Sequence, residues 1–368
     1  MAKGPEKCKR LTLAMADVQL SPILTHGPMN SLAVLRRASY AALAIAFAHL
    51  VFGAIVRISG SGMGCGDHWP LCYGRLFPPM NRPDLIVEWT HRLLASILVL
   101  AVVTLGALAW RRRREAGVGG RGGVLRAALL AVGAVIAAAL LGALTVKLGN
   151  MTYATLAHWV LAMMLFATLG AAAIRSGALG GASAVRERAA PRAARAAFAA
   201  AALAFLTVAL GGLTAKYPSA AIACRSFPLC GRDPGATAGA AHVQIVHRVL
   251  AFLLLFHLLG AVAGLTRRKS DSRVVLQAAR VALGLVVAQI VIAATMVLLT
   301  LPAVLRSLHE AVGVSVWLGT FTYAYLARLA VRGREVPAGR GHHARALDAP
   351  LAIGETTAHP QATMSSAE

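Results

Sequence analysis

Two short stretches set the framework for the whole chain: VEWTHRLLA at residues 87–95 and VQIVHRVLA at residues 243–251. Each carries a His-Arg pair at the start of a long apolar run. Three residues before the histidine, the first stretch has Glu88 and the second has Gln244. A motif that recurs this closely indicates an internal repeat, and its two copies differ by one negative charge.

The apolar runs around these stretches are too long and too numerous for a soluble domain. Hydrophobic residues make up 58% of the 368 residues, charged residues only 14%, and the mean hydropathy is +0.66. A soluble domain would carry about 25% charged residues. The net charge of +23 falls mainly in loops and tails, where it orients a membrane protein and meets anionic lipid. The chain is therefore expected to be a polytopic membrane protein that binds no nucleic acid.

Eight apolar segments are long enough to cross a bilayer of about 30 Å as helices, which satisfy their own backbone hydrogen bonds in lipid. We expect them near residues 38–57, 88–110, 124–146, 153–175, 194–215, 242–265, 274–299 and 304–329. Residues 1–33 are predicted to form a cytoplasmic leader without a signal peptide, and residues 333–368 a cytoplasmic tail. Both are polar and lack apolar periodicity, so we expect both to be disordered.

Lys and Arg residues set the expected orientation, because the cytoplasmic loops of membrane proteins are rich in them. They cluster before the first segment, after the second, fourth and sixth, and after the eighth, as in RRRR at residues 111–114. Both termini should therefore be cytoplasmic, and the other four loops should lie on the outer face of the cell membrane.

The first four segments and the last four repeat one unit. WPLC at residues 69–72 returns as FPLC at residues 227–230, at nearly the same spacing as the His-Arg pairs. Because each unit has an even number of spans, both copies enter the membrane in the same direction. We expect an all-α membrane protein of two pseudo-symmetric four-helix bundles, at residues 34–176 and 194–332, with a cytoplasmic linker at residues 177–193.

Four histidines stand within the first two turns of the second, fourth, sixth and eighth segments, at the expected outer ends: His91, His158, His247 and His309. At 1.5 Å per residue they share a level about 5–10 Å below the outer surface. Two imidazoles facing across one bundle suit a haem iron, which takes axial ligands from opposite sides. The alternatives are polar helix caps, or a zinc or copper site, for which no third ligand stands at metal spacing. His49 and His257 have no counterpart in the repeat, and we interpret them as structural.

Charged residues accompany these histidines. Arg92 and Arg248 follow theirs directly, and a guanidinium suits the carboxylates of haem propionates; snorkelling to lipid headgroups is the alternative. Glu88 shares a helix face with His91, where a carboxylate can accept a proton or stabilise positive charge on a reacting carbon. The alternative for Glu88 is a solvated acid at a helix start. Its uncharged counterpart Gln244 indicates one catalytic half and one cofactor-holding half.

Four of the five cysteines form two pairs in outward loops, Cys65 with Cys72 and Cys224 with Cys230. An oxidising compartment favours a disulfide within each loop. Redox-active thiols at these exposed positions are the alternative.

Taken together, these residues resemble the haem A synthase family. The resemblance rests on GAIVR at residues 53–57, SGSGMGC at residues 59–65, WPLC at residues 69–72, the Glu88-x-x-His91-Arg92 motif, His158, the second cysteine pair, His247-Arg248 and His309-Glu310. The family oxidises the C8 methyl group of haem O to a formyl group, by two hydroxylations and loss of water, and so makes haem A for terminal oxidases.

The resemblance also implies roles for individual residues. His247 and His309 would ligate a resident haem B, His91 and His158 would lie at the haem O site, and Glu88 would be the catalytic acidic residue. A haem O synthase and terminal oxidase assembly are the expected partners, besides membrane lipid, and oligomerisation is possible on this pattern.

Two other functions fit parts of the pattern. A di-haem electron carrier would bind haem without changing it, but it needs no difference between Glu88 and Gln244. Four histidines at one level also make no path for electrons across the membrane. A transporter with histidines on a proton path would bind no haem.

Overall fold

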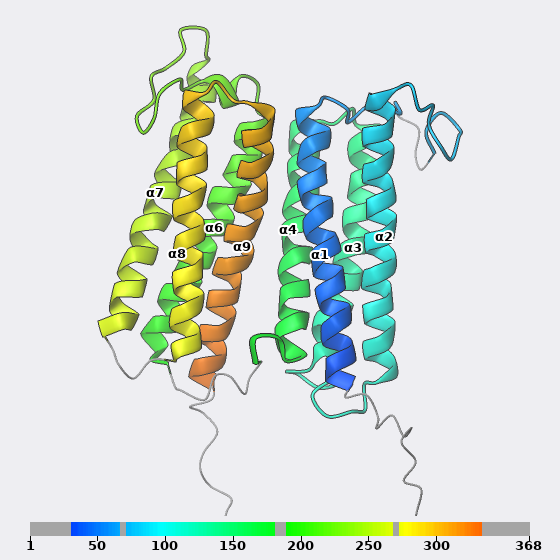
Figure 1. The fold of residues 1–368 in the computed structure, drawn as a ribbon, viewed down its shortest axis with the longest axis vertical. Coiled ribbons are helices and arrows are strands. Elements are labelled where there is room, and N and C mark those ends of the chain that lie inside the picture. The colour runs from blue at the N-terminus through cyan, green and yellow to red at the C-terminus, as the bar shows by residue number, and fades with distance from the viewer. Residues whose placement is uncertain (1–30, 67–70, 181–188, 268–271, 333–368) are drawn as a thin grey trace, which may run out of the picture.

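The computed structural model describes residues 31–66, 71–180, 189–267 and 272–332. Within them, eight helices are long and apolar enough to cross a membrane (Figure 1). These are α1 (Ser31–Ile58), α2 (Pro83–Arg111), α3 (Val124–Lys147), α4 (Thr152–Arg175), α6 (Pro191–Lys216), α7 (Ala238–Arg267), α8 (Arg273–Leu298) and α9 (Ala303–Arg332). Two short 3-10 turns, η1 (Ala178–Gly180) and η2 (Ala220–Ile222), lie between them. The predicted all-α, multi-pass membrane architecture is confirmed.

Three sequence predictions concern mainly residues that the structure does not describe. The leader up to residue 30, the linker over residues 181–188 and the tail from residue 333 lie outside the described part of the chain. Residues 31–33, which we assigned to the leader, form the start of α1.

Several helices begin earlier than hydropathy predicts. α1 starts at Ser31 rather than near residue 38, so Arg36 and Arg37 lie inside the helix rather than before it. α2 starts at Pro83 rather than near residue 88. Proline is preorganised for the first helical position, and long basic side chains can reach the headgroup region from a helix. A prediction of helix bounds from hydropathy alone takes account of neither effect.

Because α2 and α7 begin earlier than predicted, two of the four histidines stand farther along their helices than expected. His158 and His309 are each the seventh residue of their helices, but His91 is the ninth of α2 and His247 the tenth of α7. Since a turn takes 3.6 residues, His91 and His247 lie in the third turn of their helices. We expected both within the first two turns.

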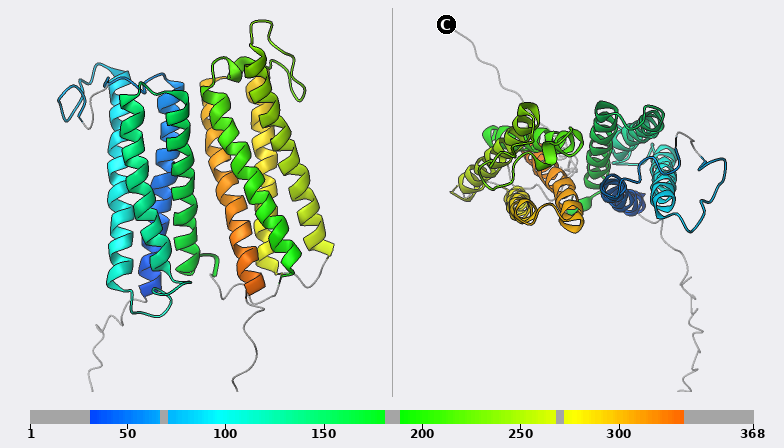
Figure 2. Two further views of the ribbon diagram at one scale, coloured as in Figure 1. Left: turned by 180° about the vertical axis from the view of Figure 1, so that it is seen from behind. Right: turned by 90° about the horizontal axis from the view of Figure 1, so that it is seen from above.

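Each half of the chain forms a closed bundle of four helices. In the first bundle, α1 to α4 pack in sequence and α4 returns to α1; in the second, α6 to α9 follow the same order and α9 returns to α6. The two bundles stand side by side with their connections at the same two ends (Figures 1 and 2). The predicted pair of pseudo-symmetric bundles is therefore confirmed.

The contacts between the bundles follow a twofold pattern. α4 packs on its own counterpart α9, while the α1–α9 and α4–α6 contacts exchange with each other under the same operation. Reciprocal contacts of this kind define an isologous interface. α4 and α9 are accordingly the most enclosed of the eight helices. In an apolar stretch of 18 residues, 56% of α4 and 50% of α9 is buried, against 11–28% in the other six.

Polar links join α4 and α9 across this interface. The Trp317 indole N–H donates to the Met163 carbonyl oxygen at 2.9 Å. Toward the opposite end from the long loops, the Arg175 guanidinium donates to the Tyr325 hydroxyl at 2.6 Å. Because an unpaired buried donor is costly, these links favour one relative position of the two bundles.

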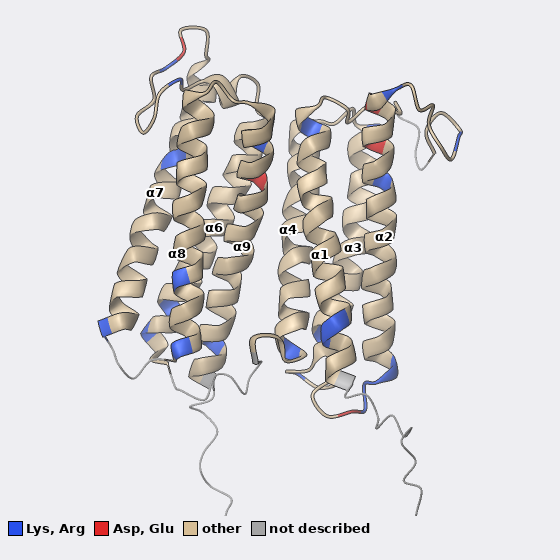
Figure 3. Cartoon of the chain, viewed as in Figure 1, with Lys and Arg blue, Asp and Glu red and all other residues tan. Residues whose placement is uncertain are grey.

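Both predicted disulfides are present in the long loops. The Cα atoms of Cys65 and Cys72 are 4.8 Å apart, and those of Cys224 and Cys230 are 4.7 Å apart. The first disulfide is buried against Leu85 of α2. Figure 3 shows that Lys and Arg gather mostly at the other end of the helices, away from these loops.

Replacing Trp317 by Phe removes the donor to Met163 but keeps an aromatic ring in the interface. The loss of one buried hydrogen bond should destabilise the protein by about 1 kcal/mol and lower the midpoint of thermal denaturation in detergent. Trp110→Phe is the control, because that side chain is 51% exposed on α2. Equal midpoints for the two variants would contradict the role of the Trp317 hydrogen bond.

Candidate functional site

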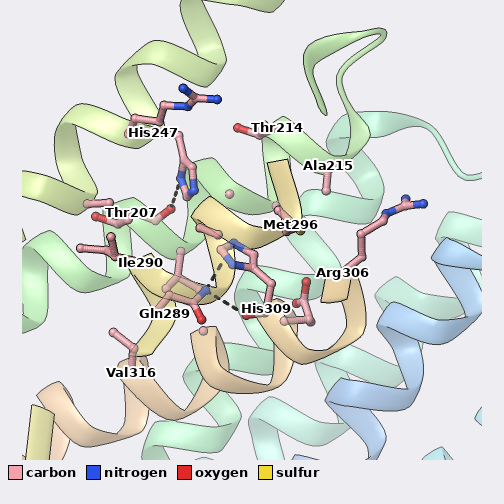
Figure 4. Close-up of a pocket in the computed structure, with 18 of the residues that line it drawn as sticks. Thr207, Thr214, Ala215, His247, Gln289, Ile290, Met296, Arg306, His309 and Val316 are labelled. Carbon is pink, nitrogen blue, oxygen red and sulfur yellow. Dashed lines mark hydrogen bonds between the residues drawn. The ribbon is translucent and has the colours of Figure 1, made fainter. Parts of the chain in front are cut away.

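Within the described residues, each bundle holds a cavity near its loop end. The first bundle has a cavity of about 1030 Å³ whose wall includes Glu88, His91 and His158. The second bundle has a cavity of about 170 Å³, lined by His247 of α7 and His309 of α9 (Figure 4). The structure thus brings the four histidines together as one pair in each bundle.

His158 packs against a glycine of the neighbouring helix α3. A Cβ atom added to Gly142 would lie 2.9 Å from His158 Cε1, so any side chain at that position would displace the ring. The ring Nδ1 lies 2.9 Å from the carbonyl oxygen of Ala138, one turn earlier on α3. Because Cβ atoms in a helix tilt toward its N-terminus, a side chain at residue 142 would cover this carbonyl. The glycine therefore both admits the ring and exposes its hydrogen-bond acceptor.

His247 repeats this arrangement in the second bundle. A Cβ atom on Gly211 of α6 would lie 3.0 Å from His247 Cε1, and Nδ1 lies 3.0 Å from the Thr207 carbonyl oxygen (Figure 4). A carbonyl can only accept, so Nδ1 carries the proton in both rings. Nε2 then keeps the lone pair that binds a metal, and the Nδ1 hydrogen bond orients the ring.

His91 is held differently. It packs against Gly53 of α1, where a Cβ atom would lie 3.2 Å from Cε1. Its ring stacks on His49, with centroids 4.2 Å apart and planes at 9°. Its Nδ1 finds no hydrogen-bond partner in the described part of the chain. The stacked ring thus takes the place of the carbonyl hydrogen bond.

The two histidines that we interpreted as structural, His49 and His257, have different surroundings. His49 lines the first cavity beside His91, and it stands four residues before Gly53 as Thr207 stands before Gly211. This shared position was a signal that sequence reasoning overlooked. By contrast, His257 Nε2 lies 2.8 Å from the Ala196 carbonyl oxygen of α6, a structural contact.

His309 is the fourth histidine, and its contacts differ from those of the other three. The Gln289 side-chain amide of α8 lies with Nε2 3.3 Å from His309 Nε2 and donates to the His309 carbonyl oxygen at 2.8 Å (Figure 4). Gln289 stands 20 residues before His309, as Ala138 stands before His158. A glutamine side chain therefore approaches this histidine where its counterpart meets a backbone carbonyl.

Glu88 is buried, with 3% of its surface exposed, and both of its carboxylate oxygens accept hydrogen bonds. The Cys65 backbone N–H donates to Oε2 at 2.8 Å, and Arg92 Nη2 donates to Oε1 at 2.5 Å. Two hydrogen bonds from opposite partners hold the carboxylate in one orientation. Glu88 therefore joins the first disulfide loop to the cavity wall, rather than standing in solvent at a helix start.

The two arginines that follow the histidines bind the loop backbone. Arg92 also donates to the Leu71 carbonyl oxygen at 3.1 Å. Arg248 donates to the carbonyl oxygens of Ser226 at 2.6 Å and of Leu229 at 3.1 Å. Equivalent guanidinium groups thus anchor the two loops beside their disulfides. Arg92 also lines the first cavity, and Arg248 lines the second.

A further arginine lines the second cavity and was missed from the sequence. Arg306 stands three residues before His309 on α9, a spacing that puts both on one helix face, and Figure 4 shows it at the cavity. Among the described residues, its guanidinium has no hydrogen-bond or ion-pair partner. The Arg-x-x-His spacing was the available signal.

One polar cluster connects the two bundles at the level of the cavities. Trp159 of α4 donates its indole N–H to Glu310 Oε1 of α9 at 3.1 Å. Glu310 Oε2 lies 3.5 Å from Arg57 Nη2 of α1. Sequence reasoning gave these three residues no role, although Trp159 and Glu310 each follow a predicted ligand directly.

Comparison with known proteins agrees with this architecture. The family model described as "Cytochrome oxidase assembly protein" (COX15-CtaA) matches residues 36–321. The chain is 28% identical over 320 residues to Heme A synthase of Geobacillus kaustophilus (strain HTA426), covering 86% of this chain and 97% of that protein. It is 29% identical over 245 residues to Heme A synthase of Shouchella clausii (strain KSM-K16), covering 65% and 79%.

A third relative, Heme A synthase of Halalkalibacterium halodurans, is 31% identical over 232 residues, which cover 61% of this chain and 74% of that protein. The match to the family model runs from α1 into α9 and includes both cavities. Since it covers well over half of the sequence, this chain belongs to the COX15-CtaA family of cytochrome oxidase assembly proteins.

Proposed function

We propose that this chain is a haem A synthase, a membrane oxidoreductase that oxidises the C8 methyl group of haem O to a formyl group. The observation that carries the proposal is an asymmetry between two otherwise matched sites. Each cavity has a pair of histidines and borders Glu310, but three residues before the His-Arg pair the first cavity has a second carboxylate, Glu88, where the second cavity has Gln244. The relatives named above carry the same activity in their names.

For the second cavity we propose a resident haem B with His247 and His309 as iron ligands. At about 170 Å³ the cavity has to widen to admit a porphyrin, since ligand pockets start at about 300 Å³. His247 presents Nε2, because its Nδ1 is engaged by the Thr207 carbonyl. The Gln289 amide has to turn away from His309 Nε2 before an iron can bind there. A bound haem iron would supply one-electron redox chemistry, and the protein would supply its ligands and electrostatic surroundings.

The first cavity suits the substrate haem O, with His91 and His158 at its iron. Its volume of about 1030 Å³ reaches the upper end of the range for ligand pockets, about 300–1,000 Å³. His158 has a carbonyl partner that raises its strength as a ligand, whereas His91 relies on packing and stacking. We infer that His91 is the weaker ligand, which suits a site that must bind substrate and release product.

Glu88 is the proposed catalytic residue. Its carboxylate is held in place by Cys65 and Arg92, so it needs no reorganisation when charge develops nearby. It would stabilise positive charge on the carbon that is oxidised or accept the proton released there. Gln244 offers no charge, so the second half lacks a carboxylate at this position.

The arginines are proposed partners for haem propionates. Arg92 and Arg248 line the two cavities while holding the loops, so a propionate would join an arginine that is already oriented. Arg306 is an additional candidate, because it lines the second cavity and its guanidinium has no hydrogen-bond or ion-pair partner among the described residues. A guanidinium fork matches a carboxylate in each case.

We also propose that the protein lies in the cell membrane with both termini cytoplasmic and the disulfide loops outside. The support is the gathering of Lys and Arg at the end away from these loops (Figure 3), which is the pattern of cytoplasmic ends. A haem O synthase would supply the substrate, and terminal oxidase assembly would receive the product.

The first test is the product. We expect membranes that contain this chain and a haem O synthase to yield haem A, or its hydroxylated intermediate, on extraction and chromatography. A Glu88→Gln variant keeps oxygen and size but removes the charge, so it should retain bound haem and lose product. Bound haem with unconverted haem O, in the presence of an electron acceptor, would favour a di-haem electron carrier instead. Full activity of the Glu88 variant would remove that residue from the mechanism.

The second test concerns the resident haem. His247→Ala should lose the low-spin haem of the purified protein, because one of the two proposed iron ligands would be gone. His257→Ala is the matched control, since His257 also lies on α7 and also contacts a carbonyl of α6 but does not line the cavity. Absorption spectra and haem content would be compared. A normal low-spin complement in His247→Ala would refute the assigned ligand.

The third test concerns orientation. Met80 is 75% exposed in a disulfide loop, and Arg114 is exposed in the loop between α2 and α3. In a Cys8→Ser background, a membrane-impermeant maleimide should label a Met80→Cys variant in intact cells. An Arg114→Cys variant should react only after permeabilisation, and the reverse pattern would invert the proposed topology.

A further inference from the structure

The two histidine pairs are connected by one short route through the protein. Trp159 follows His158 in the chain, Glu310 follows His309, and the two side chains share a hydrogen bond of 3.1 Å. The spacing from Trp159 to Glu310 equals the spacing from His158 to His309, so the two residues are counterparts in the repeat. They meet because α4 and α9 pack on each other across the pseudo-twofold relation.

A charge reinforces this contact on one side only. Arg57 of α1 lies 3.5 Å from Glu310, and the two side chains are 23% and 17% exposed. Its counterpart in α6, at the offset that relates Gly53 to Gly211, is the apolar Ala215. The ion pair is therefore not a product of the repeat itself.

A structural role alone gives little reason for this ion pair. Placing charges within membrane-spanning helices is costly, and such groups mark functional sites. A partly buried ion pair contributes little net stability, and the Trp317 and Arg175 hydrogen bonds already join α4 to α9.

The cluster also forms a wall common to both cavities. Arg57, Trp159, Gly212 and Glu310 each line the first cavity and the second. A porphyrin in either cavity would therefore border the same side chains. Gly212 contributes no side chain, so Trp159 approaches α6 closely, at 3.4 Å from where a Cβ atom would stand.

We propose that Trp159, Glu310 and Arg57, which we call the inter-cavity bridge, couple electron exchange between the two haem sites. The proposal rests on the proposed function, because it needs a redox-active porphyrin on each side. The exchanged species is one electron, lost by the reduced site and gained by the oxidised one, while no bond forms or breaks and no proton moves. From His158 to His309 the route follows covalent bonds and crosses a single hydrogen bond.

Glu310 also acts through its charge, as a positioning residue. Arg306 and Lys216 both lie close enough to Arg57 to interact with it electrostatically, so Glu310 pairs with one member of a group of three cations. Without that carboxylate, the cluster would be purely cationic and would disfavour the oxidised, more positive state of the neighbouring haem. The reduction potential of the second site should then rise.

The experiment uses the purified full-length protein with its resident haem and zinc protoporphyrin bound in the first cavity. Light excites the zinc porphyrin, which passes one electron to the ferric haem, and transient absorption records the rate. Glu310→Gln keeps an acceptor for Trp159 and removes the charge, whereas Trp159→Phe keeps a ring and removes the donor. Trp317→Phe is the matched control, because it removes an N–H bond of the same interface away from both cavities.

We expect the two bridge variants to transfer the electron about tenfold more slowly than wild type, which corresponds to ~1.4 kcal/mol in the barrier. Potentiometric titration should show a more positive midpoint for the resident haem in Glu310→Gln alone. Wild-type rates in both bridge variants, or equal slowing in Trp317→Phe, would overturn the proposal.

Failure of the proposed function would look different. If zinc protoporphyrin does not bind, the assigned substrate site is wrong, and the titration still tests Glu310. An unchanged midpoint in Glu310→Gln would then reject its action on the second site, and a positive shift would support it.

Discussion

The sites depend on close contact between an imidazole ring and a neighbouring helix that carries glycine at the point of contact. In lipid, the backbone carbonyls of a helix are already bonded within the helix and are normally covered by the side chain one turn ahead. Gly142 and Gly211 remove that cover and expose the carbonyls of Ala138 and Thr207. The ring is thereby packed, oriented and left with one tautomer, without any additional charged group in the membrane.

The repeat preserves this frame while changing the chemistry that surrounds it. In the first half, His49 replaces the partner that Thr207 provides in the second half, and the ring of His91 stacks instead of donating. In the second half, Gln289 stands where Ala138 stands in the first. Each change leaves the helices in register and alters only what a ring meets. One repeated arrangement thus presents two histidine pairs in different surroundings, which under the proposed function would ligate haem with different strengths.

The disulfide loops belong to the sites as well. Arg92 and Arg248 each connect a His-bearing helix to carbonyls beside a cysteine pair, and the Cys65 N–H fixes the Glu88 carboxylate. A disulfide limits the freedom of the loop that presents these groups. The proposed catalytic carboxylate is therefore positioned from two sides, by its own helix and by the loop.

The sequence by itself determined the eight spans, the duplication, the pairing of His91 with His158 and of His247 with His309, and both disulfides. Long apolar runs in a membrane have one main structural solution, and a repeat fixes which helices correspond. Helix starts were less predictable, because Pro83 and the arginines of α1 extend helices beyond the apolar window.

Only the tertiary structure decided which groups meet between helices. It placed His49 on His91, the Gln289 amide on His309, and Trp159 on Glu310 across the bundle interface. These contacts depend on the rotation of each helix about its axis and on how the two bundles face each other. Packing of many side chains sets both quantities together, and no local pattern in the chain encodes them.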